Sequence, residues 1–129
     1  MSLVPRVLLL VSDKDDKRRL EQNLTPYAEL SWASHPEHVS GALHGDTFDV
    51  AFCAGRELIR SWREILKSVR DLNPDLPVII LSETAGEREW VDMLDAGAFD
   101  LLVSPYSETL LPAMEHAIAS REARRFHVA

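Results

Sequence analysis

The most regular feature of the sequence is a series of short, uninterrupted apolar runs. Four of them are continuous rather than alternating, which is typical of strands that are covered on both faces in a parallel sheet. These runs span residues 7–11, 50–54, 78–81 and 101–103. A weaker, alternating stretch over residues 28–33 predicts an edge strand. The pattern therefore predicts five strands, four of which are buried.

Between these runs, apolar residues recur at the three- and four-residue spacing of amphipathic helices. Pro36 suits a helix start, Pro74 ends a helix, and Gly97 suits a helix C-terminal cap. The helical positions expected to face the sheet are Leu20 and Leu24; Leu58, Trp62, Ile65, Leu66 and Val69 on a single face; Trp90, Val91 and Leu94; and Leu110, Leu111, Met114, Ala117 and Ile118.

Strand and helix signals thus alternate five times along 129 residues. Because crossovers between parallel strands are right-handed, this alternation predicts one α/β domain with a doubly wound parallel sheet. The domain is expected to span residues 6–125, with residues 1–5 and 126–129 as terminal segments. Arg121, Arg124 and Arg125 suit the C-terminal end of the last helix, and residues 121–129 are expected to fray.

Composition narrows the class of protein. The chain has 21 acidic and 14 basic side chains, and its net charge is −7. This balance argues against nucleic-acid binding, which needs clustered lysine and arginine. The sequence has neither an apolar run of about 20 residues nor a secretory signal. Its single cysteine, Cys53, cannot form an internal disulfide. A cytoplasmic protein without membrane contact is therefore expected.

Ligands of open α/β sheets bind beyond the carboxyl ends of the strands. In this sequence the region has few reactive side chains, namely two carboxylates on different loops and three hydroxyls, and it has no lysine. The residues at the strand ends are Ser12, Asp13, Ala54, Gly55, Ser82, Glu83, Ser104 and Pro105.

Three stretches carry a resemblance to a known family. Residues 73–82 read Asn-Pro-Asp-Leu-Pro-Val-Ile-Ile-Leu-Ser, residues 96–98 read Ala-Gly-Ala, and residues 104–106 read Ser-Pro-Tyr. With these motifs, nearly the whole chain resembles a response-regulator receiver domain. The resemblance implies a flavodoxin-like (βα)5 fold with strand order 2-1-3-4-5, and a cis peptide between Ser104 and Pro105.

In the family, a histidine kinase phosphorylates an aspartate at the end of the third strand, with Mg²⁺ held by an acid pair and a lysine on the phosphoryl oxygens. Here Ala54 stands at the acceptor position, Ser12 replaces one acid, and Ser104 replaces the lysine. Alanine is no nucleophile, and the one acid left of the pair, Asp13, is a poor Mg²⁺ site. Glu83 replaces a tiny residue, so its carboxylate could plug the pocket or add negative charge near it.

Only Asp13, Ser82 and Pro105 keep the residue types that the family resemblance implies, and Leu101 replaces an aromatic residue that is common in receivers. The sequence is therefore interpreted as a pseudo-receiver. Such a module is expected to be non-catalytic, to need no cofactor or metal, and to signal through protein contacts.

Three alternatives stay open. The first is a phosphorylatable receiver with a displaced acceptor at Asp13, Asp15 or Asp16, although an acidic first helical turn explains Asp15 and Asp16 equally well. The second is a small-molecule module with a pocket formed by Ser12, Ser82 and Ser104. The third, a flavin-type enzyme, is disfavoured because residues 12–16 contain no glycine and three acids. Asp49 precedes its strand and is expected at the opposite end of the sheet.

The resemblance also implies the partners, namely a histidine kinase, an output domain, or a second copy bound through the fourth helix, fifth strand and fifth helix. The residues expected on that interface are Arg88, Asp92, Asp95, Tyr106 and Glu115. The tryptophans Trp32, Trp62 and Trp90 are expected to cover the sheet, with an interface role as the alternative for Trp90.

The remaining reactive residues have plain interpretations. His35 and His38 have the spacing of two ligands of a shared metal, but no cysteine or acidic cluster completes the set, so surface histidines are expected. Cys53 lies within a predicted buried strand and is expected to be a small core residue rather than a redox sensor.

Overall fold

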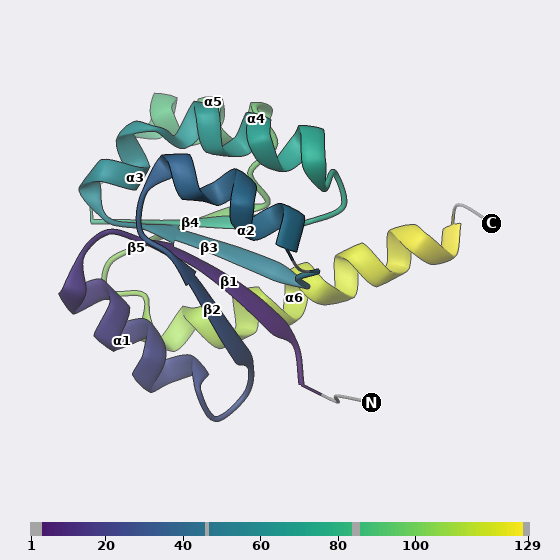
Figure 1. Ribbon diagram of the computed structural model, residues 1–129, viewed down its shortest axis with the longest axis horizontal. Coiled ribbons are helices and arrows are strands. Elements are labelled where there is room, and N and C mark those ends of the chain that lie inside the picture. Colours follow the sequence, from purple (N-terminus) through teal and green to yellow (C-terminus); the bar gives the residue numbers. More distant parts are fainter. Residues whose placement is uncertain (1–3, 46, 84–85, 128–129) are drawn as a thin grey trace.

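The computed structural model describes residues 4–45, 47–83 and 86–127. Its centre is a parallel five-stranded sheet in the order β2-β1-β3-β4-β5, which confirms the predicted flavodoxin-like topology (Figure 1). All four strand pairs are parallel. The strands are β1 (Arg6–Val11), β2 (Glu29–Ala33), β3 (Val50–Ala54), β4 (Val78–Ser82) and β5 (Asp100–Val103).

Helices cover both faces of the sheet, and each face has its own apolar core. The helices are α1 (Lys14–Leu24), the short 3₁₀ helix η1 (Pro36–His38), α2 (Val39–Gly45), α3 (Arg56–Arg60), α4 (Trp62–Leu72), α5 (Glu87–Asp95) and α6 (Ser107–His127). Residues of α1 and α6 form one core cluster, and residues of α2, α3, α4 and α5 form the other. Figure 1 shows this division, with α1 and α6 on the opposite side of the sheet from α2–α5. In the described part of the chain, no helix is long and apolar enough to span a bilayer.

The third crossover contains two helices, whereas the apolar spacing predicts one continuous helical face over residues 58–69. The backbone at Ser61 turns to φ −99° and ψ 19°, which ends α3 and begins α4. Leu58, Trp62 and Ile65 are nevertheless buried in one core cluster. The inward-facing positions were therefore predicted correctly, while the continuity of the helix was wrong.

The fourth crossover corrects a second expectation. Trp90, Val91 and Leu94 of α5 were expected to face the sheet, but their exposed fractions are 46%, 51% and 40%. Met93, on the other side of this helix, is the residue that is buried. The apolar residues Trp90, Val91 and Leu94 therefore lie on the exposed face of α5 rather than on the face that packs on the core.

The C-terminal helix corrects a third expectation. Arg121 was expected near a frayed basic end, but α6 continues to His127 and Arg121 is only 6% exposed. Its guanidinium group donates hydrogen bonds to the Phe48 carbonyl at 2.9 Å and to the Asp49 carboxylate at 2.5 Å. Asp49 also accepts a hydrogen bond from the Arg6 backbone N–H at 2.8 Å. These contacts confirm that Asp49 lies at the amino ends of the strands.

Candidate functional site

The carboxyl ends of four strands meet at one edge of the sheet, as the topology requires. Val11 pairs with Ala54, Ala54 pairs with Leu81, and Ser82 pairs with Val103. The Ser104 backbone N–H donates to the Ser82 carbonyl at 2.9 Å, and the Ser104–Pro105 peptide is cis, as the family resemblance implies. The loops that carry the candidate residues are therefore neighbours.

A cavity of about 590 Å³ opens at this edge. Of the residues predicted for the site, Asp13, Ser82 and Glu83 line it, and Ser12, Ala54, Ser104 and Pro105 do not. Gly55, which was also expected at a strand end, lines the cavity as well, and the other lining residues are Asp16, Arg56, Ile59, Arg60, Leu81 and Tyr106. Of the three serines predicted to form a small-molecule pocket, Ser82 lines this cavity.

Asp13 acts as the N-cap of α1. Its Oδ1 accepts hydrogen bonds from the backbone N–H groups of Asp15 at 2.7 Å and Asp16 at 3.4 Å. These bonds satisfy two of the N–H groups that a helix start leaves without partners. The carboxylate is thereby held in place by its own helix, and Asp15 beside it is exposed.

Asp16 and Tyr106 form a second polar contact, in which the Tyr106 hydroxyl donates to the Asp16 carboxylate at 2.9 Å. Burial raises the pKa of Asp16, and the Tyr106 hydroxyl acts in the opposite direction. Burial and the bond to Asp16 raise the pKa of Tyr106 to about 12. Tyr106 is only 2% exposed, so it is part of the core and the cavity wall rather than of the predicted interface surface.

The end of β3 carries no reactive side chain at Ala54. Ala54 is 1% exposed at the end of β3 and contributes a methyl group to the core on the α1 and α6 side. Its neighbour Cys53 is buried on the other face, and burial raises the pKa of the thiol to about 12. A thiol with this pKa stays protonated near neutral pH and is a poor nucleophile.

Two arginines of α3 are the charged cavity residues that sequence reasoning missed. Gly55 has φ +96°, and this backbone turn starts α3 directly after β3. The helix carries Arg56 and Arg60 on the cavity wall. Their spacing of four residues is a signal for one helical face, but the sequence alone does not show where that face points.

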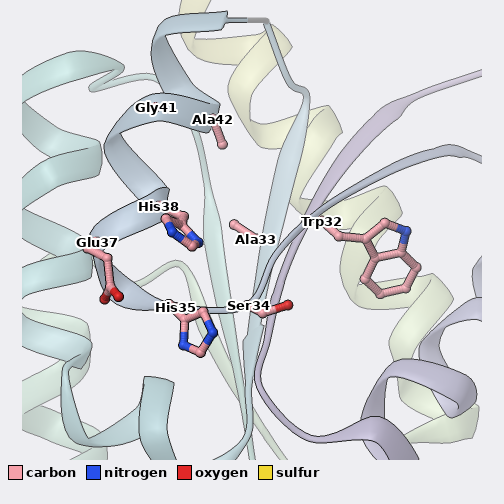
Figure 2. A pocket seen from close by; sticks show the side chains of 8 residues that line it. All are labelled: Trp32, Ala33, Ser34, His35, Glu37, His38, Gly41 and Ala42. Atoms are coloured by element: carbon pink, nitrogen blue, oxygen red, sulfur yellow. The ribbon is translucent and has the colours of Figure 1, made fainter.

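A second, shallow cavity of about 660 Å³ lies beyond the end of β2. Figure 2 shows the imidazole rings of His35 and His38 close together at this cavity, with ring centroids 5.3 Å apart. His35 also lies 3.6 Å from the Glu57 carboxylate of α3. Among the described residues, no group of three histidine, cysteine or acidic side chains is placed to hold a metal ion.

Comparison with known sequences finds distant relatives, and no protein-family model matches the chain. The C4-dicarboxylate transport transcriptional regulatory protein DctD of Rhizobium meliloti is 26% identical over 127 residues, which cover 97% of this chain and 27% of that protein. The transcriptional regulatory protein ZraR of Salmonella typhimurium is 32% identical over 74 residues, covering 54% of this chain and 17% of that protein. The chain thus spans about a quarter or less of these curated relatives.

Solved structures match the fold closely at low sequence identity. NtrX from Brucella abortus in complex with ADP superposes with a TM-score of 0.87 at 17% identity, covering 98% of this chain and 29% of that chain. The signal receiver domain of an HD domain-containing protein from Pseudomonas fluorescens has a TM-score of 0.85 at 20% identity, covering 97% and 94%. A CheY-like receiver domain from Methanospirillum hungatei has a TM-score of 0.79 at 20% identity, covering 94% and 98%. The chain therefore has the fold of response-regulator receiver domains.

Proposed function

We propose that this chain is a receiver-type signalling module that is not phosphorylated on aspartate and acts through protein contacts. The observation that carries this proposal is the buried methyl group of Ala54 at the end of β3. Covalent transfer needs a nucleophile, and developing negative charge on the phosphoryl group needs a cation. Ser104 follows β5 where the family resemblance implies that cation.

The displaced-acceptor alternative has less support from the geometry. Asp13 is held as a helix cap by two backbone N–H groups, and Asp16 accepts the Tyr106 hydroxyl. Asp15 has an exposed side chain and does not line the cavity. A carboxylate has to give up such hydrogen bonds before it can attack a phosphoryl group. The free-energy cost of breaking them makes Asp13 and Asp16 poorer phosphoryl acceptors.

The test is the intact mass after incubation with Mg²⁺ and acetyl phosphate, beside an active receiver as the positive control. We expect the wild-type mass to stay unchanged, because Ala54 has no nucleophilic atom. The matched variant Ala54→Asp, Ser104→Lys supplies a nucleophile and a cation, and we expect it to gain one phosphoryl group. A stoichiometric gain in the wild type that is lost in Asp13→Asn, Asp15→Asn or Asp16→Asn contradicts the proposal.

The exposed side of α5 supports a contact surface for a second copy of the chain. Trp90, Val91 and Leu94 form an apolar patch there, next to the charged Arg88 and Asp92. Arg88 lies one helical turn before Asp92, so a two-fold arrangement can bring the arginine of one copy opposite the acid of the other. Such self-complementarity is what a symmetric dimer needs.

The remaining interface predictions fit this surface in part. Asp95 on α5 and Glu115 on α6 are exposed, and α5 and α6 lie on opposite faces of the sheet beside the edge strand β5. Asp92 also pairs with Arg63 of α4 at 3.9 Å. We centre the proposed dimer contact on Trp90 because large exposed aromatic side chains dominate the binding energy of protein interfaces.

We expect Trp90→Ala to weaken self-association by about 2 kcal/mol, or roughly thirtyfold in the dissociation constant. Sedimentation velocity over a range of protein concentrations measures this effect. Tyr27→Ala is the matched control, because Tyr27 is 51% exposed in the turn after α1, away from α5. A monomeric wild type at high concentration, or equal effects of the two substitutions, contradicts the dimer surface.

The larger context of the module is part of the same proposal. The relatives DctD and ZraR are transcriptional regulatory proteins much longer than this chain. We therefore propose an output domain and a sensor kinase as further partners, with the module taking part in two-component signalling in the cytoplasm. The net charge of −7 supports protein partners rather than direct contact of this domain with nucleic acid.

A further inference from the structure

The cavity at the carboxyl ends of the strands contains two cationic side chains without partners. Arg56 and Arg60 lie on α3, one helical turn apart, and both line the cavity. Both are exposed, and neither makes an ion pair or a hydrogen bond within the described residues. Asp13, Asp16 and Tyr106, which also line the cavity, do make hydrogen bonds.

Two of the three acids that line the cavity make hydrogen bonds to other groups. The Asp13 carboxylate accepts two backbone N–H groups of α1, and the Asp16 carboxylate accepts the Tyr106 hydroxyl. Glu83 is exposed, and its negative charge contributes to the raised pKa of Asp16. Arg56 and Arg60 share the cavity with these three carboxylates, but neither guanidinium group is hydrogen-bonded to them, so both remain available to a ligand.

The fold places these arginines at the cavity. Gly55 adopts φ +96°, and its Cα lies so close to Ser12 that an added Cβ would lie 2.4 Å from the Ser12 hydroxyl. This close approach brings the chain over the loop that follows β1, and α3 starts at the next residue. Arg56 and Arg60 are thus held above the same strand ends that carry Asp13 and Ser82.

We propose that this cavity reversibly binds a small phosphate-bearing molecule, with the guanidinium groups of Arg56 and Arg60 donating hydrogen bonds to the phosphoryl oxygens. Arginine forks match phosphate geometry, and two of them can hold one phosphoryl group. The volume of about 590 Å³ is that of a small-molecule site rather than of a single ion. Leu81 and Ile59 provide an apolar wall for the organic part of a phosphate ester.

This inference deepens the proposed function and rests on it. If Ala54 prevents covalent phosphorylation, reversible binding at the same edge of the sheet supplies an input that requires no nucleophile. No bond forms or breaks in this step. The two ideas fail separately, because covalent transfer changes the mass of the protein and reversible binding does not.

The experiment is a nuclear magnetic resonance titration of the ¹⁵N-labelled chain that follows the arginine Nε–Hε signals. Phenyl phosphate, inorganic phosphate and phenylacetate are added in separate titrations at constant ionic strength. We expect saturable shifts at Arg56 and Arg60 with both phosphates, and tighter binding of phenyl phosphate. Phenylacetate, which carries a carboxylate, is expected to bind at least about tenfold more weakly than phenyl phosphate.

Arg56→Gln and Arg60→Gln are each expected to weaken phenyl phosphate binding by at least about tenfold, since each removes charge-assisted hydrogen bonds. Arg124→Gln is the matched control, because Arg124 is an exposed arginine of α6 outside the cavity. Circular dichroism checks that all three variants are folded.

Equal weakening by all three substitutions, the absence of saturation with phenyl phosphate, or equally tight phenylacetate binding overturns the proposal. An increase in intact mass during incubation with acetyl phosphate overturns the proposed function instead. If the mass does increase, the titration with phenyl phosphate still tests whether Arg56 and Arg60 bind phosphate.

Discussion

Replacing Arg121 by methionine is expected to lower the free energy of unfolding by about 3 kcal/mol, as measured by urea denaturation. The substitution keeps the apolar stem and the helix propensity of α6 but removes the guanidinium group. The Phe48 carbonyl and the Asp49 carboxylate then lose the guanidinium donor, while Asp49 keeps the hydrogen bond from the Arg6 backbone N–H. The Arg121 side chain is only 7% exposed, whereas that of Asp49 is 33% exposed, so water replaces just part of the lost contacts.

A control four residues along the same helix separates this effect from general loss of charge. Arg125 forms an ion pair with Asp75 at 3.6 Å, and both side chains are more than half exposed. Exposed ion pairs contribute about 0–1 kcal/mol, so Arg125→Met is expected to change stability by no more than that. Equal losses in the two variants would show that Arg121 does not act as a buried link between α6 and the sheet.

The strands could be predicted from the sequence because both faces of this sheet are covered. Each central strand is then a continuous apolar run that stands apart from its neighbours, and β1, β3 and β4 are buried along nearly their whole length. The alternating stretch that predicted an edge strand corresponds to β2, which does lie at the edge of the sheet, beside β1. Topology followed from the right-handed crossover rule and from the resemblance to receivers.

Helix faces were harder to predict, because a short helix with apolar residues at adjacent positions allows more than one inward side. In α5 the sheet buries Met93, and Trp90 and Leu94 remain on the surface. The spacing of Trp90 and Leu94 is the same as that of a buried stripe. The sequence therefore cannot distinguish a buried helix face from an exposed one in this segment.

The candidate site was predictable where strand ends define it and not where side-chain direction does. Asp13, Ser82 and Glu83 lie at strand ends or just beyond them and do line the cavity. Tyr106 turns inward to Asp16, which is 90 positions away in sequence, and Arg121 reaches Asp49 across 72 positions. Contacts at such separations depend on how helices pack, which local spacing does not encode.

The connection after β3 is the second place where one substitution is expected to have a large effect. Gly55→Ala is expected to destabilise the fold by about 3 kcal/mol or more, because a residue with a Cβ is strained at the φ of +96° that Gly55 adopts. The added Cβ also meets the Ser12 hydroxyl at 2.4 Å and the Ser12 and Asp13 backbone nitrogens at 3.2 and 3.3 Å. Urea denaturation measures the loss.

Two further variants divide this cost into its parts. Gly55→Ala combined with Ser12→Gly removes the hydroxyl contact but not the backbone strain, so it is expected to recover only part of the loss once the separate effect of Ser12→Gly is subtracted. Gly41→Ala in α2 is the matched control, because an added Cβ there meets nothing within 4 Å and alanine favours a helix. It is expected to stabilise the protein by about 0.5–1 kcal/mol. If Gly55→Ala were as harmless as Gly41→Ala, the chain after β3 could not follow the described path, and Arg56 and Arg60 would lose their place at the cavity.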